Sequence, residues 1–501
     1  MSTPVCLITP PSPFLLDERV FVSLGILRVA AALEQAGVAV EMVDLSGIEN
    51  YLDAVTAHAE QSSATAFGLT ATTPQLPAAR AIIERLRVVR PDARVILGGP
   101  HVTLVHAAHR REARDERLGR AHTALQTLRA LADVLVAGDG ERAVLLALAP
   151  DAPAVIDADA PAGGLFLSSA AYEATPPPAR HLVDMPSYHY TIDDLPATSL
   201  IAQLGCPFGC GFCGGRNSSM LRRIRTRSTA SIVHEIETLY RTWGYRGFMF
   251  YDDELNVNRG LVDLMVELVR LQERLGVDFR LRGFVKAELF TDEQADAMYA
   301  AGFRWLLVGF EAGSPRILEN INKRATREDN TRCLQTARRH GLKVKALMSL
   351  GHPGESPDSV GDLHDWLLEA RPDDFDCTII TTYPGTPYYD EAVPEPYGPG
   401  VYTYTARSGD RLHALDIDFS RVADYYKGDP DGGYRAFVYT DALSSDALVR
   451  ARDWIERDVR AVLGIPYNVS RAARRFEHSM GMGPLPPFIM RTSAPPLEVA
   501  I

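Results

Sequence analysis

The stretch Cys206-Pro-Phe-Gly-Cys210-Gly-Phe-Cys213 places three cysteines within eight residues, in a chain of 501 residues that contains only six. Three thiolates with this C-x3-C-x2-C spacing can hold an iron–sulfur cluster and leave one of its irons without a protein ligand. A four-cysteine zinc site, in contrast, has a closed coordination shell. The spacing therefore predicts a cluster bound by Cys206, Cys210 and Cys213, with one iron open to an exogenous molecule.

Two other interpretations use the same cysteines. The first is a structural zinc site whose fourth ligand, such as a histidine, lies elsewhere in the chain. The second is a disulfide framework, but the remaining cysteines, Cys6, Cys333 and Cys377, are scattered over a chain much longer than the usual disulfide-stabilised domain.

Composition narrows the class of protein. Hydrophobic residues make up 46% of the chain and charged residues 23%, which is typical of a globular protein with two or three domains. The formal net charge of −12 argues against a nucleic-acid backbone as the main partner. No apolar stretch approaches the ~18 residues of a membrane span, and prolines interrupt the N-terminus where a signal peptide would need an apolar core. We expect no nucleic-acid or membrane partner and a cytoplasmic location.

Residues 1–150 alternate between strand and helix patterns. Short β-branched or apolar runs at 5–9, 38–43, 65–70, 94–97 and 133–137 are each followed by a loop and a helical pattern, as at 24–35 and 76–88. Such alternation predicts a parallel sheet covered on both faces, in a flavodoxin-like (Rossmann-like) α/β domain. Domains of this type bind ligands beyond the carboxyl ends of their strands.

The loops at those strand ends are rich in glycine, proline and hydroxyl groups. They are Pro10-Pro-Ser-Pro-Phe14, Thr70-Ala-Thr-Thr-Pro-Gln75, Gly98-Gly-Pro-His101 and Gly138-Asp-Gly-Glu141. The first is not G-x-G-x-x-G, so a dinucleotide fingerprint is absent. The loops are either ordinary turns or the contacts of a polar ligand that approaches the backbone closely.

Residues 151–195 show no sustained period and are predicted to be a linker. Residues 196–390 again alternate, with strands expected at 198–204, 247–251, 278–283, 303–309, 343–350 and 375–382. Helices are expected at 229–243 and 259–274, and one long helix is expected to end at Gly341. Six such units predict a partial (β/α)6 barrel of the TIM type, whose chemistry lies at the carboxyl ends of the strands.

Residues 391–501 lose this pattern. A helix is expected over 445–463 in a small, mainly helical region that caps the barrel. A second interpretation gives some of its tyrosines a place in the substrate pocket: Tyr388, Tyr389, Tyr397, Tyr402, Tyr404, Tyr425 and Tyr426.

The cysteine stretch resembles the cluster motif of the radical SAM superfamily, in which an aromatic residue precedes the last cysteine, here Phe212. The resemblance implies a [4Fe-4S] cluster whose open iron chelates S-adenosylmethionine (SAM). It also implies SAM contacts by Phe212, Asp252, Asp253, Lys286, Glu311, Ser314, Leu350, Gly351 and Tyr383. Arg225 and Arg227 are further candidates for the SAM carboxylate, or belong to a solvated basic loop; Asp252 and Asp253 are otherwise helix N-caps.

The N-terminal loops resemble the cobalamin-binding domain of cobalamin-dependent radical SAM enzymes, which carries a Pro-Pro, a Gly-Gly-Pro-His and a Gly-x-Gly-Glu loop in this order. The implied cobalamin contacts are Pro11, Leu24, Gly25, Thr70, Thr72, Thr73, Gln75, Gly98, Gly99, His101, Gly138, Gly140 and Glu141. The first loop lacks the D-x-H-x-x-G motif of proteins that ligate cobalt through histidine, so we expect base-off cobalamin without a histidine ligand.

The family resemblance implies an enzyme. We expect a methyltransferase that moves a methyl group, by way of methylcobalamin, to an unactivated carbon after a 5′-deoxyadenosyl radical has removed a hydrogen atom. The alternative is a cyclase or ring-rearranging oxidase with the same cofactors but no methyl transfer. A tRNA methylthiotransferase or a cobalamin sensor fits less well, because the former needs three N-terminal cysteines and a basic tail and the latter needs no cluster. The expected partners are a small-molecule substrate, such as a natural-product intermediate, and an external one-electron reductant such as flavodoxin or ferredoxin.

Overall fold

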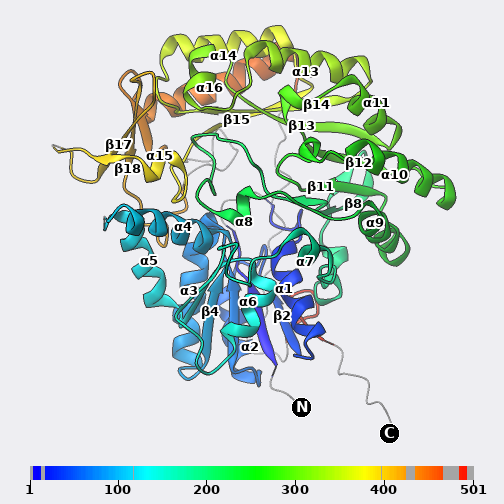
Figure 1. The fold of residues 1–501 in the computed structure, drawn as a ribbon, viewed down its shortest axis with the longest axis vertical. Coiled ribbons are helices and arrows are strands. Elements are labelled where there is room, and N and C mark those ends of the chain that lie inside the picture. The colour runs from blue at the N-terminus through cyan, green and yellow to red at the C-terminus, as the bar shows by residue number, and fades with distance from the viewer. Residues whose placement is uncertain are drawn as a thin grey trace.

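The computed structural model describes residues 4–12, 17–116, 118–396, 398–424, 435–466 and 485–493. Two α/β units are stacked along the long axis of the molecule (Figure 1). The N-terminal unit, blue to cyan, forms one end, and the barrel unit, green to yellow, forms the other. The short helix α8 (Ser219–Arg222), which follows the cysteine loop, lies at the junction of the two units.

The N-terminal unit contains the predicted flavodoxin-like sheet. Its five predicted strands are present as β1 (Val5–Thr9), β2 (Val40–Asp44), β3 (Ala66–Thr70), β4 (Arg94–Gly98) and β5 (Val134–Gly138). They pair in parallel in the order β2-β1-β3-β4-β5, so the chain reverses direction across the sheet between β1 and β3. A ligand crevice is expected at this reversal, outside the carboxyl ends of the strands.

Helices cover both faces of this sheet. They are α1 (Leu24–Gln35), α2 (Tyr51–Gln61), α3 (Leu76–Val89), α4 (Pro100–Arg114), α5 (Arg120–Leu131) and α6 (Gly140–Ala147). Helix α1 packs beside α6, and α2 packs beside α3. The apolar core under α1 is continuous with the core of the barrel, whereas α2 and α3 cover a second core on the opposite face.

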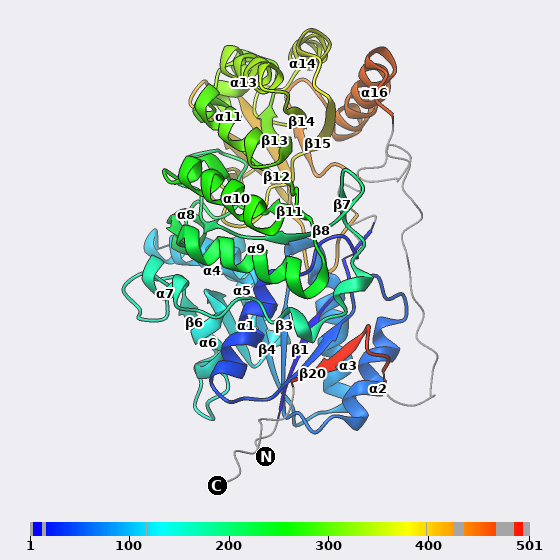
Figure 2. The same ribbon diagram turned by 90° about the vertical axis from the view of Figure 1, so that its right-hand side faces the viewer.

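The barrel unit is a curled, open sheet with the order β15-β14-β13-β12-β11-β8-β7. The six predicted parallel strands are present as β8 (Leu195–Leu200), β11 (Gly247–Phe250), β12 (Arg280–Phe284), β13 (Phe303–Glu311), β14 (Lys343–Leu350) and β15 (Asp374–Ile379). The outer helices are α9 (Thr229–Trp243), α10 (Leu261–Leu275), α11 (Asp292–Ala300), α12 (Pro315–Asn320), α13 (Arg327–Arg339) and α14 (Pro357–Ala370). Figure 2 shows these helices on the outside of the barrel strands.

One expectation about this part of the chain is wrong, and the segment predicted to be a linker contains some regular structure. The segment predicted as an irregular linker contains β6 (Val155–Ala158), α7 (Ser169–Glu173) and β7 (Thr191–Ile192); β6 extends the N-terminal sheet, and β7 pairs antiparallel with β8. The single long helix expected before Gly341 is two helices, α12 and α13. They are separated by a turn in which Asn322 and Arg324 both have positive φ.

The C-terminal region contains more strand than predicted. The expected helix is α16 (Ser445–Leu463), but an antiparallel sheet precedes it, formed by β16 (Val393–Pro394), β17 (Val401–Thr405), β18 (Arg411–Leu415) and β19 (Val438–Thr440). The last described strand, β20 (Met490–Thr492), returns to the N-terminal sheet and pairs antiparallel with β2. Three of the tyrosines singled out above, Tyr397, Tyr425 and Tyr426, lie outside the described residues.

Among the residues that the structure describes, none of the helices combines the length and the apolar character that crossing a membrane requires.

Candidate functional site

The cysteine loop is held at both ends by short strands. It begins after β9 (Gln203–Leu204) and returns through β10 (Arg225–Thr226), which pairs antiparallel with β9. Gly205 has a φ of +89°, and a Cβ atom there would lie 2.1 Å from the carbonyl oxygen of Arg223. Only glycine therefore permits the turn into the loop. On the other side, the ring of Tyr388 packs so closely that a Cβ atom on Gly211 would lie 2.5 Å from it.

The three thiols affect one another's ionisation. Burial raises the pKa of Cys206, and with the contributions of Glu254, Asp253 and Cys210 the value reaches about 11. Burial also raises the pKa of Cys213, and Cys210 and Cys206 add to the effect. Three neighbouring thiolates are stable only when positive charge lies among them, as the irons of a cluster provide. The donor set therefore fits an iron–sulfur cluster.

An ion pair lies at the carboxyl end of β13, near the cysteine loop. Glu311 has a positive φ of +67° at a bulge in this strand, which is the kind of local strain that gathers at functional sites. Lys323 Nζ donates a hydrogen bond to Glu311 Oε1 at 2.9 Å, and Ser349 Oγ donates to Oε2 at 2.8 Å. Burial raises the pKa of Glu311, but Lys323, Ser349 and His352 together outweigh it, so the pKa is lowered and the pair stays charged.

The loop after β14 completes this side of the barrel mouth. Burial lowers the pKa of His352 to about 4, so its ring is neutral at pH 7. Its Nε2 lies 2.8 Å from Ser349 Oγ, and its ring centre lies 5.3 Å from that of Phe212. Leu350 is buried, and Gly351, at a φ of +88°, donates its N–H to Glu355 at 3.2 Å. Phe212 and the loop after β14 are therefore neighbours.

A second lysine lies close to Lys323. The Nζ atom of Lys286 is 2.7 Å from Glu288 Oε1, and it donates a hydrogen bond to the carbonyl oxygen of Lys323 at 3.2 Å. Burial raises the pKa of Cys210, whereas Lys323 and Lys286 lower it, so both ammonium groups lie near this thiol. Burial raises the pKa of Glu254 to about 7. The barrel mouth thus offers both ammonium and carboxylate groups beside the cysteines.

Two of the residues predicted to contact SAM are used in other ways. Asp252 is buried, and its two oxygens accept hydrogen bonds from the backbone N–H groups of Ala202 and Gln203 at 3.1 and 2.5 Å, so it fixes the segment before the cysteine loop. Tyr383 packs against Phe419 with ring centres 5.7 Å apart, outside the group around Glu311. Asp253 accepts a hydrogen bond from the N–H of Gly205 at the start of the loop, and Ser314 is the buried N-cap residue of α12.

The two arginines considered for the SAM carboxylate are both paired with protein carboxylates. Arg225 Nη1 lies 2.6 Å from Asp139 Oδ2 in the N-terminal unit, and Arg227 Nη1 is paired with Glu235. Sequence reasoning missed Lys323 and Glu254. The sequence did contain a signal for the position of Lys323. Thr326 and Asp329 form a capping box at the start of α13, so Lys323 lies before that helix and not within it.

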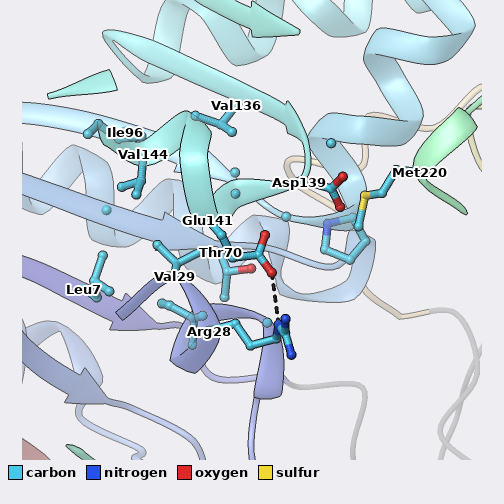
Figure 3. Close-up of a pocket in the computed structure, with 18 of the residues that line it drawn as sticks. Leu7, Arg28, Val29, Thr70, Ile96, Val136, Asp139, Glu141, Val144 and Met220 are labelled. Atoms are coloured by element: carbon cyan, nitrogen blue, oxygen red, sulfur yellow. Dashed lines mark hydrogen bonds and ion pairs between the residues drawn. The ribbon is translucent and has the colours of Figure 1, made fainter. Parts of the chain in front are cut away.

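A cavity of about 210 Å³ opens at the carboxyl ends of the N-terminal strands, close to the barrel (Figure 3). Seven of the predicted cobalamin contacts line it: Gly25, Thr70, Gly98, Gly99, Gly138, Gly140 and Glu141. Its inner wall is apolar, with Leu7, Ile96, Val136 and Val144 (Figure 3). At its rim, Arg28 Nε donates to Glu141 Oε1 at 3.0 Å, drawn as the dashed line in Figure 3.

The glycines leave room in this cavity. A Cβ atom on Gly25 would meet no atom within 4 Å, whereas Gly138, with a φ of +99°, would place a Cβ atom 2.3 Å from the backbone of Ala158. The first glycine keeps the cavity open and the second allows two strands to lie close together. A deep apolar cavity with a polar rim fits the benzimidazole tail of cobalamin, which has an apolar ring and polar substituents.

The other predicted cobalamin contacts lie outside the lining of this cavity. His101 is buried, its Nδ1 lies 3.0 Å from Thr73 Oγ1, and its ring packs against Phe419 beside a different cavity. Gln75 joins two loops, because its Nε2 donates to the carbonyl oxygen of Pro10 at 2.9 Å and its Oε1 accepts from Thr72. Pro11 and Leu24 are both buried.

The two units are docked so that the cavity and the cysteine loop adjoin. Met220, from α8, lines the cavity together with Ile201 and Leu204 of the barrel unit. Phe21, in the first loop of the N-terminal unit, packs on Tyr251 at the end of β11, with ring centres 5.3 Å apart. A ligand in the cavity would therefore face the barrel mouth.

Comparison with known proteins identifies both units. Residues 18–129 match the B12 binding domain model, and residues 200–367 match the Radical SAM superfamily model. An uncharacterised methyltransferase from Pyrococcus horikoshii is 26% identical over 338 residues, which is 65% of this chain and 69% of the relative. The anaerobic magnesium-protoporphyrin IX monomethyl ester cyclase of Rubrivivax gelatinosus is 24% identical over 344 residues, 65% of this chain and 58% of the cyclase.

A solved structure shares the whole architecture. TsrM from Kitasatospora setae, with tryptophan and the SAM analogue aza-SAM bound, has a TM-score of 0.64 at 20% identity, covering 96% of this chain and 92% of that one. The fold and the matched barrel domain define a radical SAM protein. Because a B12 binding domain precedes the barrel, the chain belongs to the cobalamin-binding-domain radical SAM family.

Proposed function

We propose that this protein is a cobalamin-dependent radical SAM methyltransferase that acts on a small molecule. One observation carries the proposal: the cavity of the N-terminal sheet and the cysteine loop adjoin, since Met220 lines the former and belongs to the segment that follows the latter. Two cofactors held at these places would face one substrate. The methyltransferase relative from P. horikoshii and the fold shared with TsrM support this reaction class.

In this proposal Cys206, Cys210 and Cys213 hold the cluster. When bound, the cluster supplies the electron that cleaves SAM to a 5′-deoxyadenosyl radical, and cobalamin carries the methyl group that is transferred. The residues of the chain bind and orient these groups. Hydrogen donors other than the substrate must be kept from the site, and the aromatic rings of Phe21 and Tyr251, which meet between the units, help to close the space.

We assign the SAM site to the charged group at the barrel mouth. Lys323 and Lys286 are the ammonium groups next to Cys210, and either can donate to the SAM carboxylate. Glu254 and Glu311 are acceptors for the SAM ammonium and hydroxyl groups. Phe212 and the backbone from Leu350 to Gly351 would lie against the adenine ring. Lys323 thus joins Lys286, already a candidate from the sequence, as a partner of the carboxylate in place of Arg225 and Arg227.

We further propose that cobalamin is bound base-off, with its benzimidazole tail in the cavity of Figure 3. The apolar wall of this cavity suits a planar apolar ring, and His101 is directed toward Thr73 and Phe419 instead. The electron paramagnetic resonance (EPR) spectrum of the Co(II) form tests this state. Superhyperfine splitting by a nitrogen ligand on the lower face of cobalt would contradict it.

The reaction class is tested with SAM that carries a CD3 group. Anaerobically reconstituted protein, a chemical or flavodoxin reductant and an extract of candidate small molecules are incubated together, and products are examined by mass spectrometry. We expect a product that gains CD3, with 5′-deoxyadenosine and S-adenosylhomocysteine formed alongside. Turnover that yields 5′-deoxyadenosine and a product without the label would contradict methyl transfer.

That second outcome would favour ring closure without methyl transfer. The specific observation in its favour is the similarity to the R. gelatinosus cyclase over 344 residues, a length comparable to that of the methyltransferase match. The same labelling experiment separates the two reactions, because only the methyltransferase forms S-adenosylhomocysteine.

A further inference from the structure

The guanidinium group of Arg216 lies beside the cysteine loop, three residues after Cys213. A Cβ atom built on Gly209, between the first two cysteines, would lie 3.5 Å from its Nη2 and 3.8 Å from its Nη1. The Nε and Nη1 atoms are buried and have no hydrogen-bond partner. Burial and the neighbouring Arg222 lower the pKa of Arg216, whereas all three cysteines raise it. The group is therefore a partly buried cation near the thiols, with its Nε and Nη1 atoms enclosed by protein.

Arg216 differs from the other arginines of the same segment. Arg225 and Arg227 are each paired with a carboxylate, and Arg222 donates to the carbonyl oxygens of Arg216 and Pro207 at 3.4 and 3.0 Å. Within the described part of the chain, Arg216 forms no ion pair with any carboxylate. Enclosing an unpaired cation in protein is costly unless an anion lies next to it. A cluster with three thiolate ligands provides that anion.

The position of this cation is determined by the contact between the two units. The backbone N–H of Arg216 donates to the carbonyl oxygen of Gly385 at 3.3 Å, and Asn217 Nδ2 donates to Asp390 Oδ2 at 2.5 Å. A Cβ atom on Gly385 would lie 3.2 Å from Leu104 of α4, and one on Gly214 would lie 3.3 Å from the same leucine. The segment that carries Arg216 is thus held between α4 and the turn after β15.

We propose that Arg216 is a tuning residue that raises the reduction potential of the cluster. Reduction adds one electron to the cluster and neither forms nor breaks a bond to Arg216. A fixed positive charge, and N–H groups directed at the sulfurs, stabilise the reduced cluster more than the oxidised one. The external donor can then reduce the cluster more readily. This inference rests on the assignment of the cluster to the three cysteines, and it is independent of whether a methyl group is transferred.

The test is an EPR-monitored redox titration of the cluster in the reconstituted protein that contains cobalamin and no SAM. We expect Arg216→Gln to lower the midpoint potential and Arg216→Lys, which keeps the charge, to leave it near that of the unchanged protein. Arg216→Met replaces the glutamine variant if the latter does not assemble a cluster. The matched control is Arg223→Gln, which removes the same charge from the same segment; the Arg223 guanidinium lies 5.8 Å from the ring of Phe166.

Iron and acid-labile sulfide are measured in every variant. An unchanged protein without a cluster would contradict the function proposed above. The role of Arg216 is tested in the variants that contain the cluster. It would be overturned if the potential of Arg216→Gln were unchanged, or were shifted no more than that of the Arg223→Gln control. A lysine variant shifted as far as the glutamine variant would also overturn it, because the charge would then be irrelevant.

Discussion

Arg225 Nη1 and Asp139 Oδ2 lie 2.6 Å apart, and both side chains are 2% exposed. This ion pair joins β10, at the end of the cysteine loop, to the N-terminal sheet. Asp139 also accepts a hydrogen bond from the N–H of Leu167 at 2.8 Å. The two units are therefore connected by a buried charge pair directly between the cavity and the cysteine loop.

Breaking this pair should destabilise the protein strongly. We expect Asp139→Asn to cost roughly 3–5 kcal/mol, because Arg225 is then left buried without a counter-charge. The double variant Asp139→Leu with Arg225→Met should lose less than the single change, since no charge remains buried. Thermal unfolding of the three proteins measures the effect. Equal losses in the single and the double variant would show that the charge pair itself matters little.

The cluster assignment predicts a sharp difference between cysteines. Replacement of Cys206, Cys210 or Cys213 by alanine should remove most of the iron and acid-labile sulfide and abolish formation of 5′-deoxyadenosine, with the circular dichroism spectrum preserved. Cys333→Ala is the control, because this cysteine is buried in α13 away from the loop. Loss of iron in the control, or retention of iron in the loop variants, would count against the site.

Lys323 should be needed for SAM binding. Removing one hydrogen bond to a charged group costs about 1.5–3 kcal/mol, so we expect Lys323→Met to weaken SAM binding roughly 10- to 100-fold. Equilibrium binding of SAM to the reconstituted protein measures the change. Lys343→Met is the control, since Lys343 is exposed at the opposite end of β14. Similar affinities for both variants would exclude Lys323 from the SAM site.

The cavity of the N-terminal sheet can be filled without a clash. Because a Cβ atom on Gly25 meets nothing within 4 Å, Gly25→Leu should occupy the cavity and weaken cobalamin binding by about 10-fold or more. Gly361→Leu in α14 is the matched control, as a Cβ atom there also meets nothing within 4 Å. Corrinoid absorbance after gel filtration reports the bound fraction; full retention in the Gly25 variant would place cobalamin elsewhere.

Asp252 should make stability depend on pH. Burial raises its pKa from 3.8 to about 7 in the folded protein, so the folded state binds a proton that the unfolded state has lost between about pH 4 and pH 7. The stabilisation by the protonated carboxyl group of Asp252 is complete below the unfolded-state pKa of 3.8, and it is lost as the pH rises through the folded-state pKa of about 7. Asp252→Asn should therefore gain in Tm relative to the unchanged protein between pH 5 and pH 8. A constant difference in Tm over this range would contradict the assignment.

Much of the architecture could be predicted from the sequence, because both sheets are parallel and buried. Their strands are apolar runs separated by amphipathic helices, and each predicted strand lies within a few residues of an observed one. The strands that were missed, β6, β7, β10 and β16 to β20, have two to five residues and lie in edge positions or in small sheets. These strands lie outside the regular alternation of strand and helix from which the other strands were predicted.

The site was less predictable than the fold for two physical reasons. The spacing of the cysteines is local, so their common loop could be recognised directly. The direction of a side chain at a strand end is not local: Asp252 turns toward the backbone before the cysteine loop, and only the three-dimensional structure reveals it. Partners across the two units, such as Asp139 for Arg225, are separated by 86 residues and leave no sequence pattern.

The antiparallel pairing of β20 with β2 has a consequence for biosynthesis. The ribosome makes β2 well before β20, the strand that covers the outer edge of the N-terminal sheet, and the whole barrel lies between them in the sequence. Until β20 has emerged, β2 presents unpaired N–H and C=O groups, which are a template for association with other chains. Premature termination anywhere before residue 490 would leave that edge bare, so truncated products should be prone to aggregate even when every residue of the barrel is present.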